Sequence, residues 1–142
     1  MIYTKWTKLA MRICFEKHKA QVDKCGMPYP FHPFHVAESM KDESTTCVAL
    51  LHDILEDTDT TAQELRDLGF SKEIVDAIAL MTHDKAVPYL DYIRTIKANP
   101  IARAVKISDL THNSDLSRLD TITDKDVERA KKYKKALEIL EE

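Results

Sequence analysis

The chain has 142 residues, 44% of them hydrophobic and 32% charged, which suits one soluble domain with its own core. Its net charge of −3 gives no electrostatic attraction to nucleic acid or to an anionic membrane surface, so we expect neither as a partner. Three unevenly spaced cysteines argue against a disulfide framework or a cysteine-based zinc site, and they fit the reducing cytoplasm. The charged N-terminal segment resembles neither a signal peptide nor a membrane span.

Glycine is scarce, with two residues in the whole chain, and this favours a fold with few tight turns. Neither common type of Gly-rich phosphate loop occurs, so a nucleotide site would have to use side chains and a metal ion. No segment alternates polar and apolar residues with a period of two, and no repeat or long linker divides the chain. We therefore predict an all-α fold, a single-domain helical bundle over residues 1–142.

Helical periodicity, capping residues and prolines place the predicted elements in chain order. An amphipathic helix over residues 2–20 is followed by a loop over 21–33 that contains Gly and Pro, and then by a short helix reaching Met40. A central, largely apolar helix over 43–56 is expected to be buried. Later helices are predicted to begin at the capping residues or prolines Thr61, Ser71, Pro88, Pro100 and Thr123, and to reach Gly69, Met81, Ile96, Leu110 and Leu140 in turn.

The end of the central helix carries an unusual set of polar residues, His52, Asp53, Glu56 and Asp57, within an apolar run. At 3.6 residues per turn, all four lie in one sector of the helix. Burying three carboxylates side by side is costly unless they bind a cation or a proton, so the segment indicates a metal site. The alternative is an ordinary amphipathic helix whose acidic face is solvated.

Two further segments offer ligands that could converge on this helix. His32 stands just before Pro33, between aromatic neighbours that indicate a packed loop, although most loop histidines are simply exposed. Asp109 and Asn113 share one face of a predicted apolar helix with Lys106. Asp109 occupies a position where a core residue is expected, as either a functional carboxylate, a buried hydrogen-bonded one or a helix-end charge.

Taken together, these residues resemble the HD superfamily of metal-dependent phosphohydrolases. Within it, the chain is most similar to the hydrolase domain of the RelA/SpoT enzymes and to the small alarmone hydrolases, over roughly residues 10–118. Three segments carry the resemblance: HKAQVDKCGMPYPFHP at residues 18–33, LHDILEDT at 51–58 and VKISDLTHN at 105–113.

The resemblance implies an HD-type helical fold over the single domain and one divalent metal ion. The ion is usually manganese in the family, with iron or zinc also suited to nitrogen and carboxylate ligands. By motif position, the implied ligands are His32, His52, Asp53 and Asp109. Glu56 and Asp57 would position or deprotonate the attacking water, and the reaction would release pyrophosphate from the 3′ position of a nucleotide such as (p)ppGpp.

The same resemblance implies a small-molecule nucleotide partner contacted by Lys24, Lys85 and Asn113. Two arginines that the family commonly carries are absent, because Asp23 precedes Lys24, and Ser114 and Asp115 follow Asn113. Losing two guanidinium groups removes bidentate phosphate recognition, and the added aspartates would repel a highly anionic substrate.

Two alternatives follow from these departures. One is hydrolysis of a different nucleotide or phosphomonoester that carries less charge. The other is a non-catalytic regulatory module that binds a nucleotide, against which the presence of both Glu56 and Asp57 argues. The patterns leave the roles of His35, His83 and His112 open.

Overall fold

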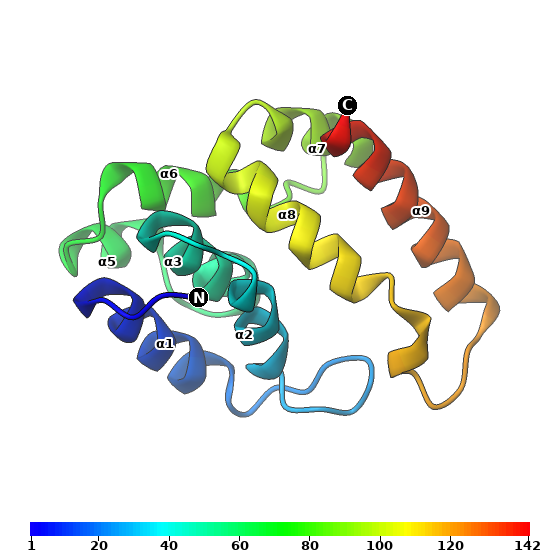
Figure 1. Cartoon of the computed structure of the whole chain (residues 1–142), viewed down its shortest axis with the longest axis horizontal. Coiled ribbons are helices and arrows are strands. Elements are labelled where there is room, and N and C mark those ends of the chain that lie inside the picture. Colours follow the sequence, from blue (N-terminus) through cyan, green and yellow to red (C-terminus); the bar gives the residue numbers. More distant parts are fainter.

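The computed structural model describes residues 1–142, which form nine α-helices and one short 3-10 helix and no β-strand (Figure 1). The all-α prediction is therefore confirmed. The helices are α1 (Lys5–His18), α2 (Phe31–Glu38), α3 (Glu43–Leu51), α4 (Ile54–Asp57), α5 (Ala62–Asp67), α6 (Lys72–Met81), α7 (Tyr89–Lys97), α8 (Pro100–Asn113), η1 (Leu116–Arg118) and α9 (Asp124–Glu141).

Side-chain caps define where most of these helices begin. Thr61, Ser71 and Thr123 each accept a hydrogen bond from the backbone N–H three residues later, as the sequence predicts for α5, α6 and α9. Asn99 caps α8 in the same way, directly before the proline at its first position. These local interactions set the helix starts before any tertiary contact is considered.

Two predicted elements differ from the structure. The loop predicted over residues 21–33 ends earlier, because α2 begins at Phe31 and includes His32. Pro33 is tolerated there, since the first N–H groups of a helix have no partner within the helix. The predicted helix over 43–56 is broken after Leu51, where Asp53 adopts φ −102° and ψ 1° before α4 begins.

Helix α3 is the centre of the molecule, and every residue from Thr46 to Leu51 is buried. It packs against α1, α2, α6 and α8, so its apolar surface is covered on all sides. Helix α9 packs against α7 and α8 and brings the C-terminal part of the chain beside the core (Figure 1). No helix has both the length and the apolar character that crossing a membrane would need.

Gly69 has a structural role that another residue could not easily fill. Its φ of +102° is rarely adopted by residues with a side chain, and an added Cβ would lie 2.8 Å from the Trp6 ring. Gly26 also has a positive φ, +79°, but an added Cβ there would meet nothing within 4 Å.

We expect Gly69→Ala to lower the free energy of unfolding by about 1–3 kcal/mol more than Gly26→Ala does, because only the former adds a clash to backbone strain. Urea denaturation of the two variants measures the difference. Equal losses would show that the close approach to Trp6 relaxes at no cost.

Candidate active site

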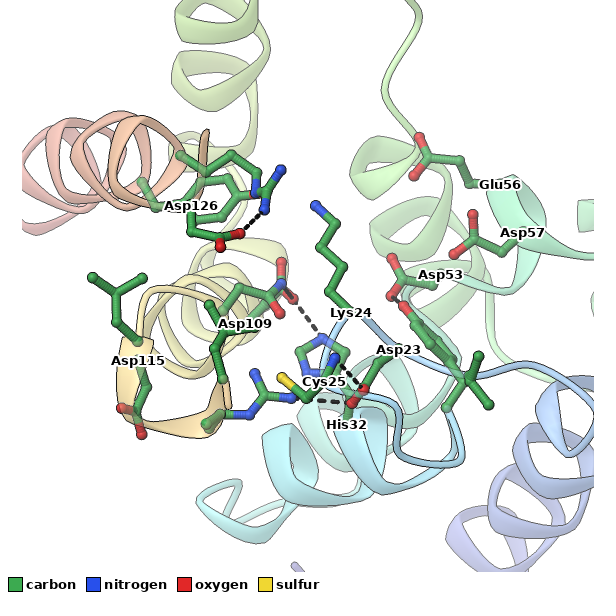
Figure 2. A pocket seen from close by; sticks show the side chains of 18 of the residues that line it. Asp23, Lys24, Cys25, His32, Asp53, Glu56, Asp57, Asp109, Asp115 and Asp126 are labelled. Atoms are coloured by element: carbon green, nitrogen blue, oxygen red, sulfur yellow. Dashed lines mark hydrogen bonds and ion pairs between the residues drawn. The ribbon is translucent and has the colours of Figure 1, made fainter. Parts of the chain in front are cut away.

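Three helices bring together a buried group of two histidines and one aspartate. His32 from α2 places its Nε2 atom 2.8 Å from Asp109 Oδ1 on α8, and His52 at the end of α3 places its Nε2 atom 3.4 Å from the same oxygen. The candidate ligand atoms of the three residues all lie within 4.8 Å of one another. All three side chains are buried, and Figure 2 shows the contact between His32 and Asp109.

The donor set of this group fits a metal ion. The Nδ1 atom of His52 lies 2.6 Å from the carbonyl oxygen of Ala49, which can only accept, so Nδ1 carries the proton. The Nε2 lone pair then faces the carboxylates of Asp53 and Asp109, and this buried atom has no hydrogen-bond partner. A positive charge at this position would resolve the arrangement, and these three residues could hold a metal cation that supplies it.

The pKa of His52 responds to the same electrostatics. Burial lowers the pKa, but the carboxylates of Asp53 and Asp109 outweigh burial and raise it well above its usual value. The site therefore attracts positive charge at the position where the two rings and Asp109 meet.

Asp53 stands beside this group. Its Oδ2 atom lies 3.0 Å from His52 Nε2 and accepts a hydrogen bond from the Tyr29 hydroxyl. Burial raises the pKa of Asp53, yet the neighbouring His52 and the Tyr29 hydrogen bond bring it down to about 2. Asp53 thus stays ionised beside His52, although it lies outside the tight group formed by the other three residues.

Asp109 is held by side chains of its own helix. Lys106 Nζ lies 2.9 Å from Oδ2, and Asn113 Nδ2 donates to Oδ1 at 3.0 Å. Burial alone would raise the pKa of Asp109, but Lys106 and His52 hold it well below its usual value. Asn113, predicted as a substrate contact, therefore also orients the carboxylate of Asp109.

His112 contacts the His32 ring on its Nδ1 side, opposite the Nε2 atom that lies near Asp109. The Nδ1 atoms of the two rings are 2.8 Å apart, and the rings are nearly parallel, with an interplanar angle of 6°. Burial and the nearby Arg118 lower the pKa of His112 to about 4, so its Nδ1 can accept the proton of His32 Nδ1 near neutral pH. This arrangement directs the His32 Nε2 lone pair toward the centre of the site.

Glu56 and Asp57 lie on α4, one turn beyond His52 and Asp53, on the accessible side of the site (Figure 2). Partial burial, followed by the charges of Asp53 and Glu56, raises the pKa of Asp57 to about 6. Glu56 instead accepts a hydrogen bond of 2.9 Å from the backbone N–H of His83 in the loop between α6 and α7.

A cavity of about 430 Å³ opens above the buried group. Loop 22–29, α4, α8, η1 and α9 surround it, and Lys24 extends into its centre (Figure 2). Of the predicted substrate contacts, Lys24 and Asn113 line the cavity, whereas Lys85 lies on the exposed loop before α7 and does not. The hydrogen bond from His83 to Glu56 keeps that loop at the edge of α4.

The cavity also contains residues that the sequence patterns missed. Arg129 and Tyr133 line it from α9, and Arg118 lines it from η1. Arg129 and Tyr133 are four residues apart and share one face of α9, and this spacing could have predicted that they lie together. The cavity therefore keeps two guanidinium groups, so the predicted loss of arginine is only partial.

Asp23 and Asp115, which were expected to repel an anionic substrate, are each held by other groups of the protein. Asp23 accepts hydrogen bonds from the backbone N–H groups of Cys25 and Met27 and pairs with Arg118, so its charge is largely neutralised. Asp115 caps η1 through Ser117, and its carboxylate turns away from the centre of the cavity (Figure 2).

No protein-family model matches the chain, but several known proteins are similar to it. The guanosine-3′,5′-bis(diphosphate) 3′-pyrophosphohydrolase of Aquifex aeolicus is 34% identical over 84% of the chain, which spans 18% of that protein. The human protein MESH1, with the same enzyme name, is 37% identical over 72% of the chain, which spans 64% of its length. MESH1 of Xenopus tropicalis is 34% identical over 77% of the chain, which covers 68% of it.

One solved structure, described as a metazoan ortholog of SpoT that hydrolyzes ppGpp, matches 99% of this chain and 88% of its own with a TM-score of 0.76 and 22% identity. The fold is therefore the HD-type helical bundle that the sequence predicts, and His32, His52 and Asp109 form a buried group within it. More narrowly, the chain belongs to the family of guanosine-3′,5′-bis(diphosphate) 3′-pyrophosphohydrolases.

We expect His112→Phe to weaken metal binding by about 10–100-fold, because the acceptor that fixes the His32 ring is lost. His112→Asn keeps a short polar group that can accept from His32 Nδ1 and should lose much less. Competition between the protein and a chelator for Mn²⁺ measures the affinities. Equal affinities for the two variants would remove His112 from metal positioning.

Proposed function

We propose that this chain is a metal-dependent nucleotide phosphohydrolase that releases pyrophosphate from the 3′ position of a guanosine bis(diphosphate)-type nucleotide. The observation that carries the proposal is the buried group of His32, His52 and Asp109, because His32 and Asp109 line a cavity that also contains Glu56 and Asp57. The names of the relatives from Aquifex aeolicus and human support the same reaction.

The proposed cofactor is one divalent ion, manganese first, with iron or zinc as chemically suitable alternatives. His32, His52, Asp53 and Asp109 would hold it. When bound, such an ion neutralises phosphate oxygens and makes a nearby water easier to deprotonate.

The residues of the chain then divide the remaining work. The water oxygen forms a bond to the phosphorus next to the 3′ oxygen as the bond between these two atoms breaks. Pyrophosphate, which carries the water oxygen, is released, and the 3′ oxygen takes up a proton from solvent to become a hydroxyl. Asp57 accepts the proton of the water, for which its raised pKa of about 6 suits it near neutral pH. Glu56 orients the same water from the accessible side, and Lys24 binds a phosphate oxygen.

We also propose that residues 1–142 act as one domain in the cytoplasm. Helix α3 joins the N-terminal helices to α8, so a single core supports the whole site. All three cysteines are free thiols, as expected in a reducing compartment.

Asp57→Asn should lower turnover of ppGpp by about 10²–10⁴-fold, because the proton acceptor is lost, while the protein still binds Mn²⁺. Asp109→Asn should lose both metal and turnover. Asp59→Asn is the matched control, since Asp59 is exposed and pairs with Lys17 outside the cavity. Pyrophosphate release and metal content are measured together. Unchanged turnover in Asp57→Asn would contradict the proposed mechanism.

Lys24→Met should raise the KM for ppGpp by about tenfold or more and change kcat less, because a charge-assisted contact to phosphate is lost. Lys85→Met removes the same charge from an exposed loop outside the cavity and should change KM much less. Steady-state kinetics at saturating Mn²⁺ compare the two. A larger effect at Lys85 would mean that its loop closes over the bound nucleotide.

A further inference from the structure

Most of the positive charge in the cavity is already engaged. Four basic side chains line it, and three of them are paired with carboxylates: Lys106 with Asp109, Arg118 with Asp23, and Arg129 with Asp126. Lys24 alone among the four has no ion pair. A phosphate entering the cavity therefore meets one free cation besides the metal site.

The pair formed by Asp23 and Arg118 is built into the wall of the cavity. Arg118 Nη2 lies 3.2 Å from Asp23 Oδ2, and Arg118 Nη1 donates to the carbonyl oxygen of His112 at 3.0 Å. The other carboxylate oxygen, Oδ1, accepts from Cys25 N at 2.8 Å and Met27 N at 3.0 Å. Only 10% of the Asp23 side chain is exposed, so solvent screens this pair weakly.

The location of the pair indicates which part of a substrate it meets. Glu56 and Asp57 stand on one side of the buried group, whereas Asp23 and the loop after it stand on another side (Figure 2). A phosphate that reacts beside Asp57 leaves the rest of the nucleotide to extend through the remaining cavity, toward Lys24 and Arg118.

We propose that Asp23 masks Arg118 and thereby makes the site select nucleotides with few phosphates at the end remote from the reacting group. This inference rests on the proposed function and names its substrate class. A guanidinium held by a carboxylate and a carbonyl has fewer donors left for a phosphate, and the carboxylate itself repels an added phosphate group. Each further phosphate at the remote end thus adds repulsion without gaining an arginine contact.

A series of guanosine nucleotides tests the inference directly. Each member carries a 3′-diphosphate, and the 5′ position carries one, two or three phosphates. With Mn²⁺ present, kcat/KM for pyrophosphate release should fall as 5′ phosphates are added. A flat or rising series would overturn the inference. Silence toward all three, with metal bound, would instead contradict the proposed function.

Asp23→Asn gives the sharper test. Its Oδ1 still accepts from Cys25 and Met27, so the loop keeps its shape, while the new amide cannot pair with Arg118. We expect kcat/KM for the triphosphate member to rise about tenfold or more, as a freed guanidinium gains a charge-assisted contact, and that for the monophosphate member to change far less. Adding Arg118→Gln to this variant should remove the gain.

Asp115→Asn is the matched control, because it removes the same charge at the cavity edge without releasing an arginine. Its gain should be much smaller than that of Asp23→Asn. Equal gains in kcat/KM for the two variants, or equal gains for all three nucleotides, would mean that only the net charge of the cavity matters. Either result would overturn the masking role of Asp23. Thermal unfolding of each variant checks that it remains folded. If a variant does not fold, the series of three nucleotides on the wild-type protein still tests the inference.

Discussion

The buried carboxylate of Asp109 is the interaction on which the rest of the site depends. An ionised group inside a protein must be paired and hydrogen-bonded, or the fold loses several kcal/mol. Asp109 meets this requirement with partners from three helices: His32 on α2, His52 at the end of α3 and Lys106 on α8. The same contacts that make the charge tolerable therefore fix the position of α2, α3 and α8 around the site.

The break in the central helix is what makes this convergence possible. In one continuous helix, His52, Asp53, Glu56 and Asp57 would share a face and compete for one volume. Instead, the turn at His52 and Asp53 ends α3 with the His52 ring directed toward Asp109, and α4 carries Glu56 and Asp57 at the accessible edge. The proposed metal ligands His52 and Asp53 are thereby separated from the proposed proton acceptor Asp57 within a few residues of the chain.

Local interactions account for what could be predicted from the sequence. The caps at Thr61, Ser71 and Thr123 act within one helical turn, so the sequence alone reveals them. The cluster at His52 and Asp53 was recognisable because charge in an apolar run needs an explanation.

What escaped prediction depends on long-range contact. Arg118 reaches the cavity by pairing with Asp23, 95 residues away in the chain, and no local pattern encodes that partner. The early start of α2 and the break after Leu51 likewise follow from packing around α3, which overrides local preference. His112 could not be assigned because its role depends on a contact with His32, 80 residues away.

The charge of the cavity relates binding of the proposed metal ion to binding of the proposed nucleotide. Carboxylates outnumber basic side chains in the lining, and Asp53 and Asp57 lie where the proposed mechanism places the reacting phosphate. Without a cation, these groups repel phosphate, and with one, the same groups hold the ion that attracts it. In the proposed reaction, the metal and the nucleotide would therefore strengthen each other's binding through shared carboxylates. By thermodynamic reciprocity, each would raise the affinity of the other equally. An anionic cavity can in this way serve an anionic substrate, with selectivity left to the few cations, such as Arg118, whose pairing the protein controls.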